Sequence, residues 1–395
     1  MPTDDTALPY AELTPHQQKQ RLQELAIVFL KLGAIAFGGP AAHVAMMNDE
    51  VVQRRQWLSR ERLLDLLGVT NLIPGPNSTE LAIHIGYERA GLKGLMVAGT
   101  CFILPAMLIV WGLAAIYVRY QTLPELEWLL YGIKPAIIAI VLQALWKLGK
   151  TAIKDIPSAI AGIAVMAAFL GGADEVLLLF LAGLGVMLCK TLSRKSGSSA
   201  LLMTIPNFLA QMSHTSAAME KPGGFQVFVL FLKIGSVLYG SGYVLLAFLQ
   251  QDFVERTHWL TSQQLLDAVA IGQLTPGPVF TTATFIGYLL AGHVGAIAGT
   301  IGIFLPAFIL VAIINPWVPK LRSSPGVSGF LDGVNAASLG LMAVVTYTLS
   351  RTALVDWITL GLAIGCAGAV FRFKVNSIWL VLAGGLVGFL AKAWG

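Results

Sequence analysis

The stretches NLIPGPNSTE at residues 71–80 and QLTPGPVFTT at residues 273–282 decide how this chain folds. Each places Pro-Gly-Pro inside an otherwise apolar segment. Proline lacks the N–H group that a helix needs and clashes with the preceding turn, and glycine frees the backbone. In hydrocarbon, such a break is tolerated only where protein or a water-filled cavity surrounds it. The sequence therefore predicts two broken helices that face the protein interior.

The composition is typical of a protein embedded in a membrane. Of the 395 residues, 56% are hydrophobic and 12% are charged, whereas soluble domains contain roughly 25% charged residues. Charge-free runs cover residues 95–118, 159–173 and 294–318, and a run of about 18 residues can span a bilayer. Because backbone in lipid must satisfy its own hydrogen bonds, we expect an all-α polytopic membrane protein.

The remaining composition points to no other class of partner. The net charge of +5 comes from basic loops beside apolar segments, where it sets membrane topology, so no nucleic-acid partner is expected. Residues 1–24 are polar and predict no cleavable signal peptide. Cys101, Cys189 and Cys366 lie far apart in apolar segments, which favours inert buried thiols. No metal site and no cofactor is expected.

The chain contains an internal repeat. FLKLG at 29–33 recurs as FLKIG at 231–235, an offset of 202, and the same offset relates the two Pro-Gly-Pro stretches. Beyond them the offset becomes 201, as for IGY at 85–87 and 286–288. A register kept over so much of each half indicates a duplication. The predicted division is a polar tail (1–24), a first membrane repeat (25–192), a linker (193–224) and a second membrane repeat (225–395).

Loop charges predict that the second repeat is inverted. Lys and Arg mark the cytoplasmic side of a membrane. The loop with Arg54 and Arg55 corresponds to one with Asp252 and Glu255 in the second half. The other loops also change between a basic and an acidic excess from one half to the other. Each half shows six apolar segments, yet inversion requires an odd number of crossings. Each Pro-Gly-Pro segment is therefore predicted to be a re-entrant hairpin, which leaves about five transmembrane helices per repeat.

The two Pro-Gly-Pro breaks are the predicted substrate site. Because proline favours the first turn of a helix, half-helices should begin at Pro76 and Pro278 and leave the N–H groups of residues 77–79 and 279–281 unpaired. Such groups and the positive helix end bind anions, and inverted-repeat transporters place paired broken helices around the substrate. The alternative is a proline kink without a ligand. The substrate-binding residues predicted here are Pro74, Gly75, Pro76, Asn77, Ser78, Thr79, Pro276, Gly277, Pro278, Thr281 and Thr282.

A second break interrupts the first apolar segment of each half, at residues 37–40 and 239–242. Its glycines should face the hairpin tips and wall the site, although close helix packing is the alternative explanation. A lysine lies two turns before each break. An intramembrane lysine indicates function, whereas snorkelling to the interface is the alternative. The residues added to the site are Lys31, Gly38, Gly39, Lys233, Gly240, Ser241 and Gly242.

Other titratable side chains are candidates for proton coupling. Glu80 and His84 are one turn apart, so they share a helix face and could relay protons. The alternative is a hydrogen-bonded pair that orients the hairpin. His43 is a further candidate. Lys134 and its counterpart Asn335 form a secondary pair of candidates, because a cation in one half only would make the site asymmetric, and a surface position is the alternative.

Several motifs resemble the chromate ion transporter family in its long, two-half form. They are FGGPAAH at 37–43, WLSR at 57–60, NLIPGPNSTELAIHIGY at 71–87 and TTATFIGY at 281–288. The segment pattern extends the resemblance over essentially the whole chain. It implies two antiparallel halves in a bacterial inner membrane that export chromate and confer resistance, with sulfate as the expected competitor. Transporters of this kind are commonly dimers, so a homodimer is one expected assembly.

Membrane energetics are compatible with export. Moving one charge through 100 mV is worth about 2.3 kcal/mol, so a dianion leaving an inside-negative cell gains about twice that. Uniport driven by the potential and proton-coupled transport both stay open, as do a sulfate or other oxyanion transporter and a passive anion channel. A membrane chromate reductase is disfavoured, because no redox-centre motif is present, and the chain is not expected to be an enzyme.

Overall fold

The computed structural model describes residues 10–71, 73–120, 123–195, 222–239, 242–315, 325–373 and 375–394. Over these ranges the chain is helical and forms no strand, which confirms the all-α expectation. In the first half the main helices are α1 (Pro15–Ile35), α2 (Gly39–Asn48), α3 (Arg60–Thr70), α4 (Asn77–Tyr120), α5 (Pro124–Ala152), α6 (Ile156–Leu170) and α7 (Glu175–Lys195). In the second half they are α8 (Gly224–Val237), α9 (Leu245–Leu249), α10 (Ser262–Leu274), α11 (Thr282–Ile314), α13 (Pro325–Ala353), α14 (Trp357–Phe373) and α15 (Ser377–Ala393).

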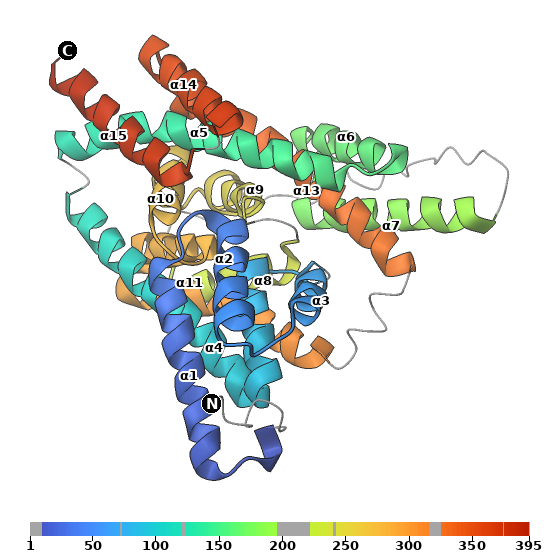
Figure 1. The fold of residues 1–395 in the computed structure, drawn as a ribbon. Helices are drawn as coiled ribbons and strands as arrows, with labels where there is room; N and C mark the ends of the chain where they lie inside the picture. The colour runs from blue at the N-terminus through green and yellow to red at the C-terminus, as the bar shows by residue number, and fades with distance from the viewer. Residues whose placement is uncertain are drawn as a thin grey trace.

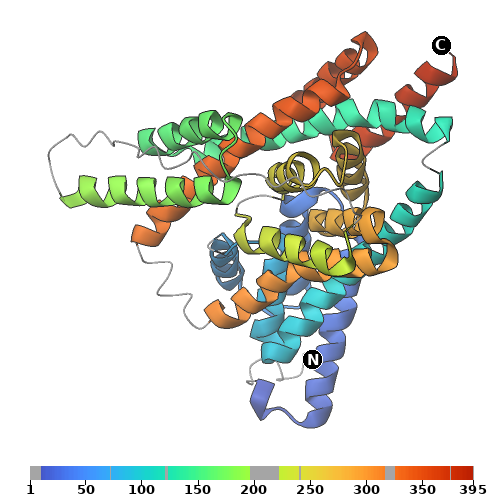
Figure 2. The ribbon, with the colours of Figure 1, turned by 180° about the vertical axis from the view of Figure 1, so that it is seen from behind.

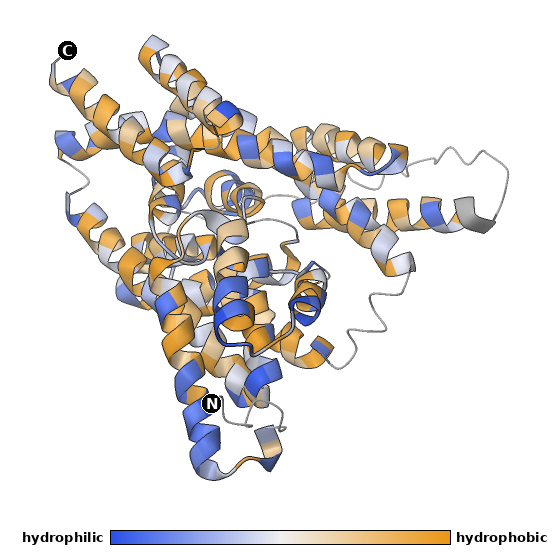
Figure 3. Cartoon of the chain, viewed as in Figure 1, coloured by the Kyte–Doolittle hydropathy of each residue, from blue (hydrophilic) through white to orange (hydrophobic). Residues whose placement is uncertain are grey.

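Five of the described helices are long and apolar enough to cross a membrane, and four shorter ones are also apolar. The five spans are Asn77–Tyr120, Pro124–Ala152, Glu175–Leu192, Val279–Ile314 and Gly326–Ala353. Figure 3 shows hydrophobic residues along most helices, while hydrophilic ones gather at places such as the start of α1. Large apolar side chains such as Trp357 and Ile156 are exposed, as expected for a surface that meets lipid. The chain is therefore a multi-pass membrane protein. The division at residues 24, 192 and 224 and the number of crossings stay predictions, and most of the predicted linker lies outside the described residues.

The helices form two layers that Figures 1 and 2 show one above the other. The upper layer consists of α5, α6, α7, α13, α14 and α15, and the lower layer of α1 to α4 and α8 to α11. In the upper layer, α5 packs against α14 and α15, and α13 packs against α6 and α7. Each long helix therefore packs on helices of the other half, while α5 and α13 contact each other. The two halves are interlocked and could not separate as independent domains.

Within α4 the chain doubles back. The backbone is non-helical at Ala90 and Gly91, and Gly91 has a φ of +58°, which favours glycine. The turn brings Gly86 against Gly94, so that a Cβ on either residue would overlap the main chain of the other. In α11, Ala291 and Gly292 turn the chain in the same way. Both α4 and α11 thus consist of a short arm before the turn and a long arm after it.

The short arm of α4 and helix α3 lie side by side as a hairpin. Arg62, at the start of α3, contacts Glu88, at the end of the short arm, with Nη2 and Oε1 2.6 Å apart. The outer ends of the two segments therefore meet, and the Pro-Gly-Pro stretch between them forms a tip. That this hairpin enters and leaves a membrane on one side stays a prediction.

The crossing of the two arms makes Gly86 a sensitive position. Gly86→Ala should lower the free energy of unfolding by about 1–3 kcal/mol, a usual cost of overpacking, because its methyl group would overlap the Gly94 carbonyl oxygen. Gly112→Ala in the same helix is the control, since its methyl group would meet nothing within 4 Å. Thermal unfolding of both variants in detergent tests this, and equal Tm values would contradict the close crossing.

Candidate functional site

Each Pro-Gly-Pro tip binds the main chain of the other half. The Gly75 N–H donates to the Leu238 carbonyl oxygen at 2.8 Å, and the Gly277 N–H donates to the Ala36 carbonyl oxygen at 2.8 Å. Ala36 and Leu238 are the C-cap residues that directly follow α1 and α8, just before the second breaks. The donors of the two bonds are 202 positions apart, and so are the acceptors, so the two bonds are equivalent contacts of the two repeats. The halves are therefore related by a pseudo-two-fold axis.

Only glycine fits at the two tips. Gly75 and Gly277 have φ values of +138° and +86°, which other residues rarely adopt. A Cβ on Gly277 would lie 2.6 Å from the Ala106 Cβ, and one on Gly75 would lie 3.5 Å from the Ala307 Cβ. Ala106 and Ala307 follow the equivalent prolines inside α4 and α11. Each tip is thus fixed against the long arm of the other half.

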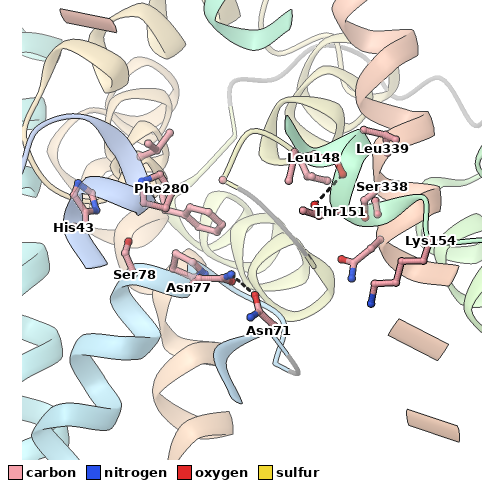
Figure 4. Close-up of a pocket in the computed structure, with 17 residues that line it drawn as sticks. His43, Asn71, Asn77, Ser78, Leu148, Thr151, Lys154, Phe280, Ser338 and Leu339 are labelled. Carbon is pink, nitrogen blue, oxygen red and sulfur yellow. Dashed lines mark hydrogen bonds between the residues drawn. The ribbon is translucent and has the colours of Figure 1, made fainter. Parts of the chain in front are cut away.

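A cavity of about 470 Å³ lies between the two layers, beside both tips. Figure 4 shows His43, Asn77, Ser78 and Phe280 on one side of it, facing a group around Thr151, Ser338 and Lys154. The lower layer contributes Pro40, His43, Asn71, Pro76, Asn77, Ser78, Gly242, Val244, Val279 and Phe280, and the upper layer contributes Leu148, Thr151, Ala152, Lys154, Asn335, Ser338 and Leu339. Asn71 and Lys154 are exposed, so the cavity opens to the surface at their end.

The first tip presents polar groups to this cavity. Helix α4 begins at Asn77, and the first N–H groups of a helix have no partner inside it. Thr79 and Glu80 both donate to the Pro76 carbonyl oxygen, which leaves the N–H groups of Asn77 and Ser78 without a backbone partner among the described residues. The expectation of a free N–H at Thr79 is therefore wrong. The Asn77 side chain donates to Asn71 Oδ1 at 2.9 Å, and this pair lines the cavity beside the positive end of the helix.

The second tip is mainly apolar toward the cavity. Its lining residues are Val279 and Phe280. The Thr281 N–H and hydroxyl both donate to the Pro278 carbonyl oxygen, and the Thr282 hydroxyl donates to Val279 at 2.8 Å. Both threonines are buried. A free N–H at Thr281 was expected and is also wrong, because a short 3-10 turn (Val279–Thr281) closes the tip.

Lys154 is the cation of the cavity among its described lining residues, and the sequence did not single it out. Its Nζ lies 2.7 Å from Asp332 Oδ1, and its side chain is 57% exposed. Asp332 also binds Lys190 at 2.6 Å, and Lys190 in turn binds Asp155 at 2.6 Å. Asp332 would therefore keep a cationic partner if Lys154 turned toward the cavity.

The two predicted intramembrane lysines lie outside the cavity lining. Lys31 Nζ is 3.4 Å from Glu50 Oε2, and Lys233 Nζ is 2.9 Å from both Asp252 and Glu175. The Lys31–Glu50 and Lys233–Asp252 pairs are equivalent under the repeat offset. These lysines join α1 and α8 to the π-helical segments Asp49–Arg54 and Gln250–Arg256, and their role in substrate binding stays a prediction.

The second breaks are only partly described. Gly38 and Gly39 have φ values of +103° and +78° and start α2. Gly242 lines the cavity, whereas Gly240 and Ser241 lie outside the described residues. Of the remaining predicted glycines and prolines, Pro76 lines the cavity, and Pro74, Gly75, Pro276, Gly277 and Pro278 shape the tips behind it.

Three predicted titratable residues are buried around the first tip. Both carboxyl oxygens of Glu80 lack a hydrogen-bond partner within the described chain, and the carboxyl lies against Gly75. His84 Nδ1 lies 3.0 Å from Asn315 Oδ1, so the expected alternative of a Glu80–His84 hydrogen bond is not formed here. His43 Nε2 lies 3.0 Å from the Ala36 carbonyl oxygen. His43 alone of the three lines the cavity.

Lys134 and Asn335 occupy equivalent positions but different surroundings. Lys134 Nζ lies 2.9 Å from Asp267 Oδ1, and the two side chains are only 5% and 4% exposed. The Tyr117 hydroxyl donates to Asp267 Oδ2 at 2.8 Å. Asn335, in contrast, lines the cavity. The described residues hold no group of three or more His, Cys, Asp or Glu side chains that could bind a metal ion.

Comparison with known proteins gives the family of this chain. The model of the chromate transporter family matches residues 23–188 and again residues 225–389, which confirms the internal repeat. The chain is 32% identical to a chromate transport protein of Cupriavidus metallidurans over 99% of this chain and 97% of that protein. It is also 32% identical to a chromate transport protein of Pseudomonas aeruginosa, over 92% and 90% of the two chains. No solved structure matches it. The chain therefore belongs to the chromate transporter family.

Proposed function

We propose that this protein carries chromate, a tetrahedral dianion, out of the cytoplasm through the cavity between its two tips. The observation that supports this most is the lining of that cavity. It combines the N-terminal end of α4, the side chains of Asn77 and Ser78, and the ammonium group of Lys154. Hydrogen-bond donors, a helix N-terminus and one exposed lysine form a suitable set of groups for an oxyanion.

The cavity is large enough for a hydrated anion. Its volume of about 470 Å³ far exceeds the roughly 10–15 Å³ that one water molecule needs. A partly hydrated oxyanion could therefore enter without losing all its water. Charge is supplied by a lysine already paired with Asp332, so binding would be weak enough to permit release.

The direction of transport is inferred from loop charges. The cavity opens at the loop that follows α5, near Lys147, Lys150 and Lys154. Clusters of lysine mark the cytoplasmic side of bacterial membranes. In this conformation the site would thus load from the cytoplasm. The potential supplies about 2.3 kcal/mol per charge at 100 mV, so a dianion can leave without a coupled ion.

Alternating access follows from the same proposal. The two tips would be re-entrant hairpins of an inverted repeat, and the two layers would move relative to each other around the anion. A carrier differs from a channel in that it exchanges bound substrate across the membrane. The first experiment is therefore counterflow of radiolabelled chromate into proteoliposomes loaded with unlabelled chromate.

Internal chromate should accelerate uptake of the label by the wild-type protein, and sulfate should compete with it. Lys154→Gln should lower this exchange at least tenfold at low chromate, because the cavity loses its cation, whereas Lys154→Arg should retain most of it. Lys147→Gln is the matched control, since Lys147 lies within α5, seven residues before Lys154, and does not line the cavity. Exchange by Lys154→Gln within twofold of wild type would contradict the site, and label uptake without acceleration would indicate a channel.

We further propose that Glu80 couples transport to protons. A buried carboxyl without hydrogen-bond partners is costly in its charged form, and it lies directly behind the first tip. A change in its protonation would therefore alter how the tip packs. A pH gradient imposed without a potential should change the rate of chromate flux by the wild type, whereas Glu80→Gln should not respond.

Both proteins should respond equally to a potential imposed without a pH gradient. Glu125→Gln is the control, because Glu125 is an exposed carboxylate in the first turn of α5. A full pH response in Glu80→Gln would contradict the role of this residue. A wild type that ignores the pH gradient would instead identify transport as uniport.

A further inference from the structure

The pseudo-two-fold relation assigns every residue of the open cavity a counterpart in the other half. Across α5 and α13 the offset is 201, as Thr151-Ala152 matches Thr352-Ala353. Asn335 therefore corresponds to Lys134, and Lys154 corresponds to Val355. The four lining residues Pro40, His43, Asn71 and Asn77 correspond, with an offset of 202, to Gly242, Leu245, Gln273 and Val279.

The counterpart of the open cavity is closed in this structure. Leu245 and Gln273 line a gap of about 10 Å³, and Gly242 and Val279 lie between this gap and the open cavity, since they line both. The open cavity separates the end of α3, at Asn71, from α13, at Asn335. The equivalent helices α10 and α5 pack together instead. One side of the pseudo-symmetric site is open and the other is shut.

An ion pair joins the two helices on the shut side. Lys134 of α5 binds Asp267 of α10, and Tyr117 of α4 donates a hydrogen bond to the same carboxylate. Asn335, at the equivalent place on α13, carries no charge. Breaking a buried ion pair by removing one partner is costly, because it leaves the other charge uncompensated. Separation of α10 from α5 would therefore require another anion for Lys134.

We propose that Lys134 is an anion-binding residue of the opposite-facing state, and that Asp267 occupies it in the present one. The proposal rests on the proposed chromate transport. In inverted-repeat transporters, exchange of the conformations of the two halves produces the opposite-facing state. Lys134 would then line the cavity as Asn335 does here, and the transported anion would replace the Asp267 carboxylate.

The arrangement gives each state one lysine for the anion. Lys154 serves the state seen here, and its counterpart Val355 cannot serve the other. Lys134 would serve the opposite-facing state, whereas its counterpart Asn335, which lines the present cavity, carries no charge. Lys134 lies inside α5, 18 residues before its end at Ala152, which is about 27 Å at 1.5 Å per residue. Lys154 follows two residues after that end, so the two lysines lie at well-separated levels. Each is paired with a carboxylate in this structure, Lys154 with Asp332 and Lys134 with Asp267.

Counterflow of labelled chromate in four variants tests this role. Lys134→Gln should lose at least nine-tenths of the exchange, and the double variant Lys134→Gln/Asp267→Asn should stay equally low although it leaves no unpaired charge. Lys134→Arg should retain a third or more, because a guanidinium group also binds oxyanions. Asp267→Asn keeps Lys134 and removes its carboxylate partner. This variant should therefore still exchange chromate, and its KM for chromate at the extracellular face should be severalfold lower than that of the wild type.

A purely structural ion pair predicts a different pattern. In that case the neutral double variant would exchange within twofold of the wild type, and Asp267→Asn would be as inactive as Lys134→Gln, and either result would overturn the proposal. Thermal unfolding in detergent checks that the double variant is folded, and Asp267→Asn tests the role with Lys134 in place. Absence of exchange in the wild type would overturn the proposed transport function itself, which separates the two failures.

Discussion

The structure depends on two reciprocal hydrogen bonds between backbone groups of opposite halves, from Gly75 to Leu238 and from Gly277 to Ala36. A chain broken at Pro-Gly-Pro exposes N–H and carbonyl groups, and away from water each unpaired group costs free energy. Here each half supplies the partner that the other lacks. Because only glycine tolerates the φ values and the close packing at the tips, no side chain could replace this contact. The Ala36 carbonyl oxygen also lies 3.0 Å from His43, so the same bond fixes one wall of the cavity.

This exchange between halves continues in the upper layer. Gly132 of α5 lies against Gly384 and Gly388 of α15, and its counterpart Gly333 of α13 lies against Gly183 of α7. In a membrane, where lipid is as apolar as leucine, close contact of small residues is a main source of helix association. The interlocked helices give each layer its own packing, while the cavity and its polar groups lie between the layers. The proposed movement of one layer against the other would leave this packing within each layer unchanged.

Much of the site could be predicted from the sequence, because broken helices and repeats leave direct marks in it. Asn77, Ser78, Pro76, Gly242, Asn335 and His43 were predicted, and they line one cavity. Lys31 and Lys233 were predicted from their depth, but depth does not reveal a partner such as Glu50 or Asp252. Lys154 was not predicted, because nothing in the local sequence shows that the segment after α5 faces the tips. The contacts between halves use backbone groups, which every residue type provides, so they left no signal except the glycines.

The chemistry of the two halves has diverged although the backbone contact of their tips is the same in both. The first tip offers polar groups at Asn77 and Ser78, and the second offers Val279 and Phe280 at the equivalent places. A symmetric pair of polar tips would hold a dianion from two sides and would oppose its release. In the proposed site, one polar tip, one apolar tip and a lysine that already has a carboxylate partner would bind an anion less tightly. A transporter needs this balance, because an anion held too strongly occupies the site and stops turnover. The divergence between the repeats is therefore expected wherever a duplicated scaffold must release a strongly charged ligand.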